Sequence, residues 1–248
     1  MNSARNWAEL GLFWNVNYEE PPQELEKWLR TAQLHAMASR SRLRLNLENE
    51  QQPGGAQLQE IEMNAGRIKK NTKVQSRYTV TTRIEAGTFG QVYQARDLQR
   101  SRTLVALKLV DAIKTKNAAR EIDFLDAIQL CSDNTNREKI VRLLDVFDVS
   151  VNSSRTICFC LELLGLDIDQ VITMNEYKPL PPKYALQAIG DVLKGLHFLH
   201  DCVHVSHLDI KDTNVCYISR SMQFKYNMRL PSSPYVKIID FNSASFKQ

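Results

Sequence analysis

The sequence lacks the features of a secreted or membrane-inserted protein. No apolar run approaches the roughly 20 residues that a membrane-spanning helix needs. The first residues, MNSARNWAELGLFW, contain a single arginine and an apolar stretch too short for a secretory signal peptide. These absences predict an intracellular protein of the nucleus or cytoplasm, with no membrane partner.

The sequence also lacks the cysteine spacing of a disulfide scaffold and of a CxxC site. The five cysteines form no CxxC pair and show no spacing typical of a disulfide scaffold. They are therefore expected to be reduced thiols, as in most intracellular proteins. The five are Cys131, Cys158, Cys160, Cys202 and Cys216.

Neither sign of charge is in large excess. A net charge of +4 over 248 residues permits an anionic ligand but does not call for nucleic acid. No direct nucleic-acid partner is therefore expected. The hydrophobic content of 43% and the charged content of 24% are those of a soluble globular protein, and the length allows one or two domains.

Composition divides the chain into three zones. Residues 1–48 are predicted to be a partly helical N-terminal extension, because apolar residues recur at helical spacing after Pro21 and Pro22. Residues 49–77 are polar and basic and are expected to be a linker. Residues 78–248 have the pattern of a folded domain. The helically spaced residues of the extension are Leu25, Trp28, Leu29, Ala32 and Ala36.

The domain begins with a strand-rich part and continues with a helical one. Alternating β-branched and apolar residues predict five strands, whereas a period near 3.6 residues predicts two helices. This order predicts an α+β fold with two lobes. The strands are expected near 78–84, 91–98, 103–110, 140–149 and 156–164, and the helices over 117–130 and 184–200.

Two features of the strand-rich part suit the binding of a phosphate. Gly87 and Gly90 lie between the first two predicted strands, where a glycine hairpin lets backbone amides approach phosphate oxygens. Lys108 lies on an apolar strand and needs an anionic partner, since a buried unpaired ammonium is costly. Glu121, on the following helix, is suitably placed. Each feature alone also fits an ordinary turn or a solvent-exposed lysine.

A third cluster of polar residues lies in the helical part. The run SHLDIKDTN (206–214) places Asp209, Lys211 and Asn214 within six residues. The run VKIIDFN (236–242) follows, with Asp240 at the end of a predicted strand. A carboxylate that orients a hydroxyl, a lysine near a phosphate and an Asn/Asp pair on magnesium are what phosphoryl transfer requires.

Histidines offer a competing interpretation of the same region. His197, His200, His204 and His207 lie within eleven residues, and such clusters can bind zinc. No thiol or carboxylate completes a convincing ligand set, and the phosphoryl-transfer pattern accounts for His207. Zinc is therefore the weaker hypothesis.

In the same order along the chain, these elements resemble the motifs of eukaryotic protein kinases. The segments CFCLELLGL (158–166) and DFNSA (240–244), with an insertion at 219–235, are most similar to the CDC-like (LAMMER) kinases of the CMGC group. SR-protein kinases and homeodomain-interacting kinases are similar over VLKGLHFLH and VKIIDF. The resemblance implies an N-lobe over 78–164, made of an antiparallel sheet and one helix. It also implies a helical, incomplete C-lobe over 165–248.

The resemblance also implies a role for each matching residue. ATP and Mg²⁺ would be the cofactors, and a protein hydroxyl would receive the γ-phosphate. Asp209 would orient that hydroxyl and Lys211 would support the γ-phosphate, while Asn214 and Asp240 would hold magnesium. The implied ATP-binding residues are Gly87, Gly90, Val92, Ala106, Lys108, Glu121, Leu161 (the gatekeeper), Glu162 and Leu164.

Four positions depart from the family pattern. Glu85 replaces the first loop glycine, Leu208 replaces an arginine that CDC-like kinases also lack, and Asp212-Thr213 replaces Pro-Glu. Asn242 replaces the glycine of the D-F-G motif, and asparagine tolerates positive φ better than most residues. None of these changes alone is expected to abolish the chemistry.

The sequence ends at Gln248, eight residues after Asp240, before the expected activation segment and A-P-E motif. The leucines at 186, 193, 196 and 199 are therefore expected to face water. The main prediction is a serine/threonine or dual-specificity protein kinase, with Arg/Ser-rich proteins implied as substrates. The alternatives are a nucleotide-binding pseudokinase or regulatory fragment, and a truncated gene product.

Overall fold

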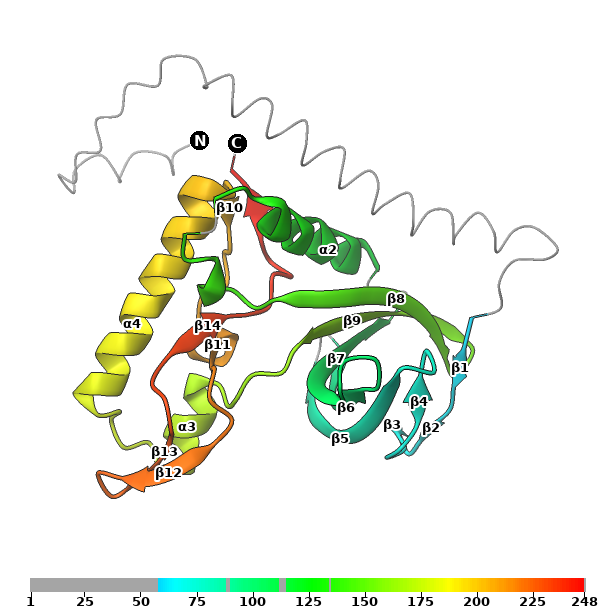
Figure 1. The fold of residues 1–248 in the computed structure, drawn as a ribbon, viewed down its shortest axis with the longest axis horizontal. Helices are drawn as coiled ribbons and strands as arrows, with labels where there is room; N and C mark the ends of the chain where they lie inside the picture. The colour runs from blue at the N-terminus through cyan, green and yellow to red at the C-terminus, as the bar shows by residue number, and fades with distance from the viewer. Residues whose placement is uncertain (1–57, 88–89, 112–114, 134, 248) are drawn as a thin grey trace, which may run out of the picture.

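The structure is a computed structural model that describes residues 58–87, 90–111, 115–133 and 135–247. The predicted helix of the N-terminal extension lies outside these residues. Figure 1 shows two parts, a curved sheet with helix α2 above it and a second part built around helix α4. Among the described residues, no helix is long and apolar enough to cross a membrane.

A seven-stranded sheet forms the first part. Its strand order is β1-β8-β9-β7-β6-β5-β4, and all neighbours are antiparallel except β1 and β8. The five long strands occupy the segments that alternation predicts. The strands are β1 (Glu60–Ile61), β4 (Lys73–Val74), β5 (Tyr78–Gly87), β6 (Gly90–Asp97), β7 (Thr103–Asp111), β8 (Leu143–Val151) and β9 (Ser154–Glu162).

Residues 58–77, which their polar composition assigned to a linker, contain short strands. β1 pairs in parallel with the end of β8, β2 (Met63–Asn64) pairs with β3 (Arg67–Ile68), and β4 extends the sheet beside β5. Three side chains of this segment, Ile61, Ile68 and Val74, are buried in the core of the sheet. Isolated apolar residues in a polar segment leave too weak a pattern to predict such pairing.

The second part contains two helices and several short strand pairs. α4 (Pro182–His197) begins at a proline in its first turn and continues into a π-helical turn, Phe198–Cys202. α3 (Ile168–Met174) begins with a capping box made by Asp167 and Gln170. The strands are β10 (Val205–Ser206), β11 (Val215–Tyr217), β12 (Met222–Lys225), β13 (Met228–Pro231), β14 (Val236–Ile238) and β15 (Ser245–Phe246).

One hydrophobic core joins the two parts. It combines residues of α2 (Thr115–Leu130) and β9, such as Ile122 and Phe159, with Phe198, Ile238 and Phe241 of the second part. All five side chains are at most 2% exposed. One continuous core therefore holds both lobes together.

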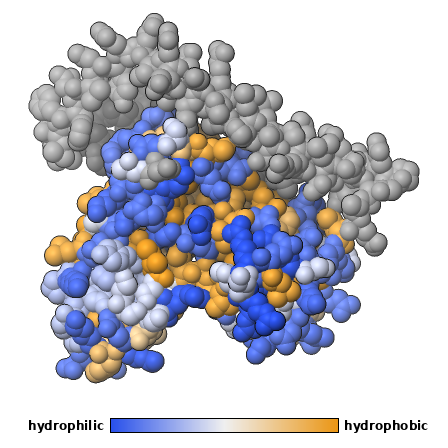
Figure 2. Space-filling view, in the orientation of Figure 1, coloured by the Kyte–Doolittle hydropathy of each residue, from blue (hydrophilic) through white to orange (hydrophobic). Residues whose placement is uncertain are grey.

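The exposed face of α4 differs in part from the expectation. Leu186 and Leu193 face water, at 70% and 61% exposure, and Ile189 lies between them at 57%. Leu199, however, is fully buried in the shared core, and Leu196 packs against that core. Their prediction as exposed residues is wrong, because the helix turns its C-terminal end toward α2 and the core. Figure 2 shows hydrophobic surface over α4, at the left edge of the view.

Candidate active site

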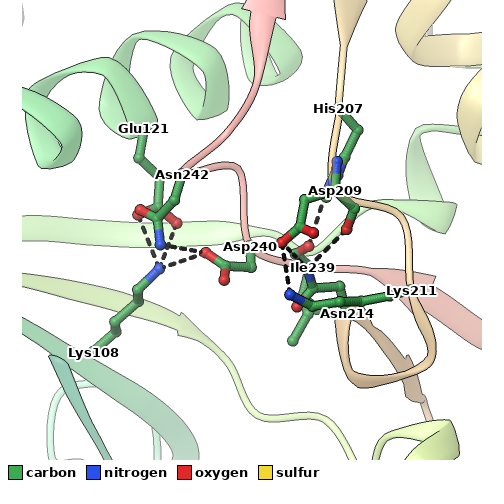
Figure 3. A network of polar contacts seen from close by, with 9 residues as sticks. All are labelled: Lys108, Glu121, His207, Asp209, Lys211, Asn214, Ile239, Asp240 and Asn242. Carbon is green, nitrogen blue, oxygen red and sulfur yellow. Dashed lines mark hydrogen bonds and ion pairs between the residues drawn. The ribbon is translucent and has the colours of Figure 1, made fainter. Parts of the chain in front are cut away.

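Lys108 occupies the middle of β7 and points into the space between the lobes. Its neighbours along the strand are buried, so its ammonium is drawn into an apolar environment. Nζ bonds both carboxylate oxygens of Glu121, at 2.8 and 2.9 Å, and Oδ1 of Asp240 at 3.0 Å. Figure 3 shows the three groups converging from β7, α2 and the segment after β14. The predicted partner of Lys108 is confirmed by this contact.

Burial and charge compete in this cluster. Burial disfavours the ammonium of Lys108, but the carboxylates of Glu121 and Asp240 outweigh it and raise the pKa of the lysine. Burial raises the pKa of Glu121, which is 2% exposed, and the adjacent ammonium opposes that effect. Each of the two charges needs the other, since either charge alone would be buried without compensation.

The buried side chain of His207 anchors the loop from His207 to Asn214. His207 is 1% exposed, and burial lowers its pKa, so the ring is neutral at physiological pH. Nε2 lies 2.9 Å from the carbonyl oxygen of Ile239 and donates to it, while Nδ1 accepts the backbone N–H of Asp209. The ring also meets Phe241 edge-on, with centroids 4.9 Å apart. His207 thus links the loop to the segment that carries Asp240.

Asp209 presents a carboxylate that is bound by two donors. Lys211 Nζ and Asn214 Nδ2 each donate to its Oδ2 at 2.9 Å. The hydrogen bond from Lys211 holds the pKa of Asp209 below its usual value, so the group is ionised at neutral pH. An ionised carboxylate of this kind can accept a hydrogen bond from a substrate hydroxyl.

Asn214 and Asp240 each keep one oxygen available. Asn214 uses its amide nitrogen to bind Asp209, and neither its Oδ1 nor Oδ2 of Asp240 has a hydrogen-bond partner among the described residues. Carboxylate and amide oxygens are the donors that Mg²⁺ prefers in proteins. The residues present therefore fit a magnesium ion.

Sheet pairing brings the predicted nucleotide-binding residues together. Val92 on β6 lies opposite Lys108, and Ala106 on β7 lies opposite Leu161 at the end of β9. Leu164 follows β9, and its backbone makes no backbone hydrogen bond to any described residue. The backbone N–H and C=O of Leu164 are thus available to a ligand at the hinge between the lobes.

The hairpin between β5 and β6 needs a glycine where the backbone leaves no room for a Cβ, as the sequence already suggests. Gly87 and Gly90 are paired at the end of β5 and the start of β6. Gly90 has a φ of +139°, and a Cβ there would lie 2.2 Å from the carbonyl oxygen of Leu109. No larger residue fits this position.

Three contacts at the site were not predicted from the sequence. Lys237 on β14 bonds the Glu162 carboxylate at 2.5 Å, and Asn242 bonds Asp240 at 2.7 Å. Asp167 caps α3, and its burial raises its pKa to about 6, helped by the nearby carboxylates of Asp169, Glu85 and Asp212. The capping sequence Asp167-x-x-Gln170 could have been recognised in the sequence. The contact of Lys237 with Glu162 joins distant segments, and the contact of Asn242 with Asp240 depends on the conformation of a loop.

The competing zinc interpretation finds no support among the histidines that the structure describes. Nδ1 of His197 contacts Asp201 at 2.6 Å, and His207 is committed to Ile239. In the part of the chain that the structure describes, no three side chains of His, Cys, Asp or Glu could together hold a metal ion. All five cysteines are free.

Known proteins match the chain over this same region. The protein kinase domain family matches residues 78–248. Dual specificity protein kinase CLK2 of Mus musculus is 33% identical over 181 residues, which are 70% of this chain and 35% of the mouse protein. Dual specificity protein kinase lkh1 of Schizosaccharomyces pombe is 31% identical over 189 residues, 73% of this chain and 26% of the yeast protein.

A further relative and a solved structure agree. SRSF protein kinase 3 of Mus musculus is 32% identical over 151 residues, 60% of this chain and 26% of that protein. A crystal structure of a kinase domain superposes with a TM-score of 0.63 at 23% identity, covering 76% of this chain and 56% of the other. The chain thus spans about a third or less of the length of these curated relatives. With the family match over most of its length, the chain belongs to the protein kinase family, and its fold is the two-lobed fold of that family.

Proposed function

We propose that the chain binds ATP with Mg²⁺ between its lobes and transfers the γ-phosphate to a hydroxyl group of a protein. The observation that carries the proposal is the contact of Lys108 with both Glu121 and Asp240. This contact joins the sheet, helix α2 and the Asp240 segment in one arrangement. The second cluster, Asp209, Lys211 and Asn214, lies on the other side of Asp240 from Lys108 and Glu121 (Figure 3).

Each side chain has a role that its contacts support. Lys108, fixed by Glu121, places a positive charge where the α- and β-phosphates of the nucleotide would lie. Leu164 offers backbone groups to the adenine ring, between the apolar surfaces of Val92, Ala106 and Leu161. Asn214 and Asp240 would hold Mg²⁺, which supplies charge neutralisation on the phosphate oxygens. Asp209 orients the substrate hydroxyl, and Lys211 stands beside it as the cation for the transferred group.

A second candidate is a nucleotide-binding regulatory protein without turnover. Burial raises the pKa values of Asp167 and Cys216, and the negative charge of Glu85, which stands in place of a loop glycine, adds to the rise in both. A carboxylate at the mouth of the site would repel nucleotide phosphates. The substrate class that the resemblance to CDC-like kinases implies, Arg/Ser-rich proteins, belongs to the first candidate only.

A thermal-shift titration with ATP and Mg²⁺ tests nucleotide binding. At a concentration about 100-fold above Kd, a ligand stabilises the fold by about 2.7 kcal/mol, which raises Tm by several degrees. Lys108→Ala and Asp240→Ala are expected to lose this rise. Lys225→Ala, which removes an equal charge from the exposed tip of β12, is the control and should keep it.

Phosphate transfer separates the two candidates. Wild-type chain is expected to transfer ³²P from ATP to an Arg/Ser-rich protein, and Asp209→Asn to bind ATP but transfer none. Binding without transfer in the wild type would favour the regulatory candidate. A folded wild type with no nucleotide response would contradict both.

A further inference from the structure

Asn242 makes a contact that a glycine at the same position has no means to make. Its Nδ2 donates to Oδ1 of Asp240 at 2.7 Å, and the same oxygen accepts Nζ of Lys108 at 3.0 Å. Figure 3 shows both donors on one side of the Asp240 carboxylate, with Asn214 on the other side. One oxygen of Asp240 is therefore held by two donors.

This arrangement restricts the carboxylate of Asp240 without using up its capacity for a cation. The donor of Asn242 is neutral, so it fixes the orientation of the group, while Lys108 supplies the only positive charge in contact with it among the residues that the structure describes. Oδ2 has no hydrogen-bond partner among the described residues and is turned away from both donors. A carboxylate with one oxygen anchored and the other available is prepared to bind a metal ion.

The backbone increases the need for such an anchor. Asp240 has a φ of +64°, a left-handed conformation that is uncommon for residues other than glycine. Phe241, between the two residues, is fully buried in the shared core and holds the turn from the other side. The Asn242 amide closes the turn by binding back to the side chain two residues earlier. Loss of the amide would leave the side chain of Asp240 anchored by Lys108 alone.

We propose that Asn242 is a positioning residue that fixes Asp240 for the binding of Mg²⁺. The proposal rests on the proposed function, because it concerns the metal that accompanies the nucleotide. Hydrogen-bond partners of metal-ligating carboxylates contribute about 10- to 100-fold to metal affinity. The asparagine in place of glycine is thus a support for the metal site of this chain.

The test compares metal-dependent and metal-free nucleotide binding in Asn242→Ala and in the wild type. Isothermal titration gives the Kd of ATP in EDTA, and then the Mg²⁺ concentration that half-saturates the ATP complex. Mn²⁺, followed by electron paramagnetic resonance, reports occupancy of the metal site directly. We expect Asn242→Ala to need about 10-fold more metal, with the metal-free Kd unchanged within twofold. A purely structural role would move both values together.

Two further variants make the outcomes decisive. Asn242→Gly removes the same amide and should raise the metal requirement in the same way, whereas Ser243→Ala changes an exposed neighbour and should not. An unchanged metal requirement in Asn242→Ala, with the wild type responding to metal, would overturn the role of Asn242 alone. A wild type that binds nucleotide without any response to Mg²⁺ or Mn²⁺ overturns this proposal and the magnesium part of the proposed function. Absence of any nucleotide or metal binding overturns both entirely.

Discussion

At the scale of single residues, the Lys108–Glu121 pair shows how a functional group limits stability. The side chains are 11% and 2% exposed, so each charge depends on the other for compensation. Burying two charges is costly, and a well-packed apolar pair in their place is often as stable or more so. The pair is therefore better explained by the ligand that Lys108 would meet than by a gain in stability.

A double variant separates these two roles. Lys108→Met leaves the carboxylate of Glu121 buried without its ammonium and should lower the free energy of unfolding by about 3 kcal/mol. Adding Glu121→Leu removes the orphaned carboxylate and should restore most of that loss. Urea unfolding followed by circular dichroism measures both effects. Restored stability with no recovery of the ATP-dependent thermal shift is the expected result, and a stable single variant would contradict it.

Asp167 gives a prediction for pH dependence. Burial, together with neighbouring carboxylates, raises its pKa to about 6 in the folded chain, so the folded state binds this proton more tightly than the unfolded state. The contribution of Asp167 to stability is therefore full below about pH 4 and is lost as the pH rises through about 6. Asp167→Asn keeps the cap on α3, because asparagine caps helices as well as aspartate does.

The measurable quantity is the difference in unfolding free energy between Asp167→Asn and the wild type. It should be near zero at pH 4, grow in favour of the variant between about pH 4 and 6, and then level off. Chemical denaturation at four pH values would show this curve. Glu176→Gln, which neutralises a surface carboxylate, serves as the control. A flat difference across the whole range would count against the raised pKa.

At the scale of secondary-structure elements, two glycines have opposite surroundings. Gly190 lies inside α4, and a Cβ there would meet no atom within 4 Å. Gly165, just after the hinge, packs against the segment that follows β11, and its Cβ would lie 2.1 Å from the carbonyl oxygen of Ser219. A helix interior favours alanine, but a backbone contact at that distance admits only glycine.

Alanine at the two positions should change stability in opposite directions. Gly190→Ala is expected to stabilise the chain by about 1 kcal/mol through helix propensity. Gly165→Ala is expected to destabilise it by about 1–3 kcal/mol, because backbone must shift to admit the new methyl group. Thermal unfolding of both variants gives the comparison. Equal Tm values would mean that the hinge does not approach Ser219 as closely as described.

At the scale of the whole molecule, the two lobes share a core rather than a surface contact. Phe241 lies fully buried in that core, between the His207 loop and residues of α2. Side chains of both lobes surround it, and removal of the ring would open a cavity at their junction. Because this core continues from one lobe to the other, unfolding of one lobe should expose apolar surface of the other.

The chain is therefore expected to unfold in one cooperative transition. Circular dichroism and tyrosine fluorescence should give the same urea midpoint. Phe241→Ala should lower the free energy of unfolding by about 3–5 kcal/mol, whereas Phe224→Ala, at 75% exposure on β12, should change it by less than about 0.5 kcal/mol. Two separate transitions would show that the lobes are independent folding units.

Much of the fold was predictable from local pattern. Alternation along β5, β6 and β7 and the helical period of α4 depend on residues close in sequence, and they hold in the structure. The short strands β1–β4 did not follow from pattern, because their pairing depends on partners as distant as Ser150 and Val151. Leu199 was assigned to the surface because helical periodicity shows which side chains share one face of a helix. It does not show which other elements pack against that face.

The sequence by itself determined the order of elements, the family and the identity of the residues at the candidate site, because spacing within each motif is local. Only the tertiary structure decided that Lys108 meets Asp240, 132 positions away, as well as its predicted partner Glu121, 13 positions away. It also decided that Asn242 shares an oxygen of Asp240 with that lysine. Such contacts depend on the packing of two lobes around one core, and no local pattern contains that information.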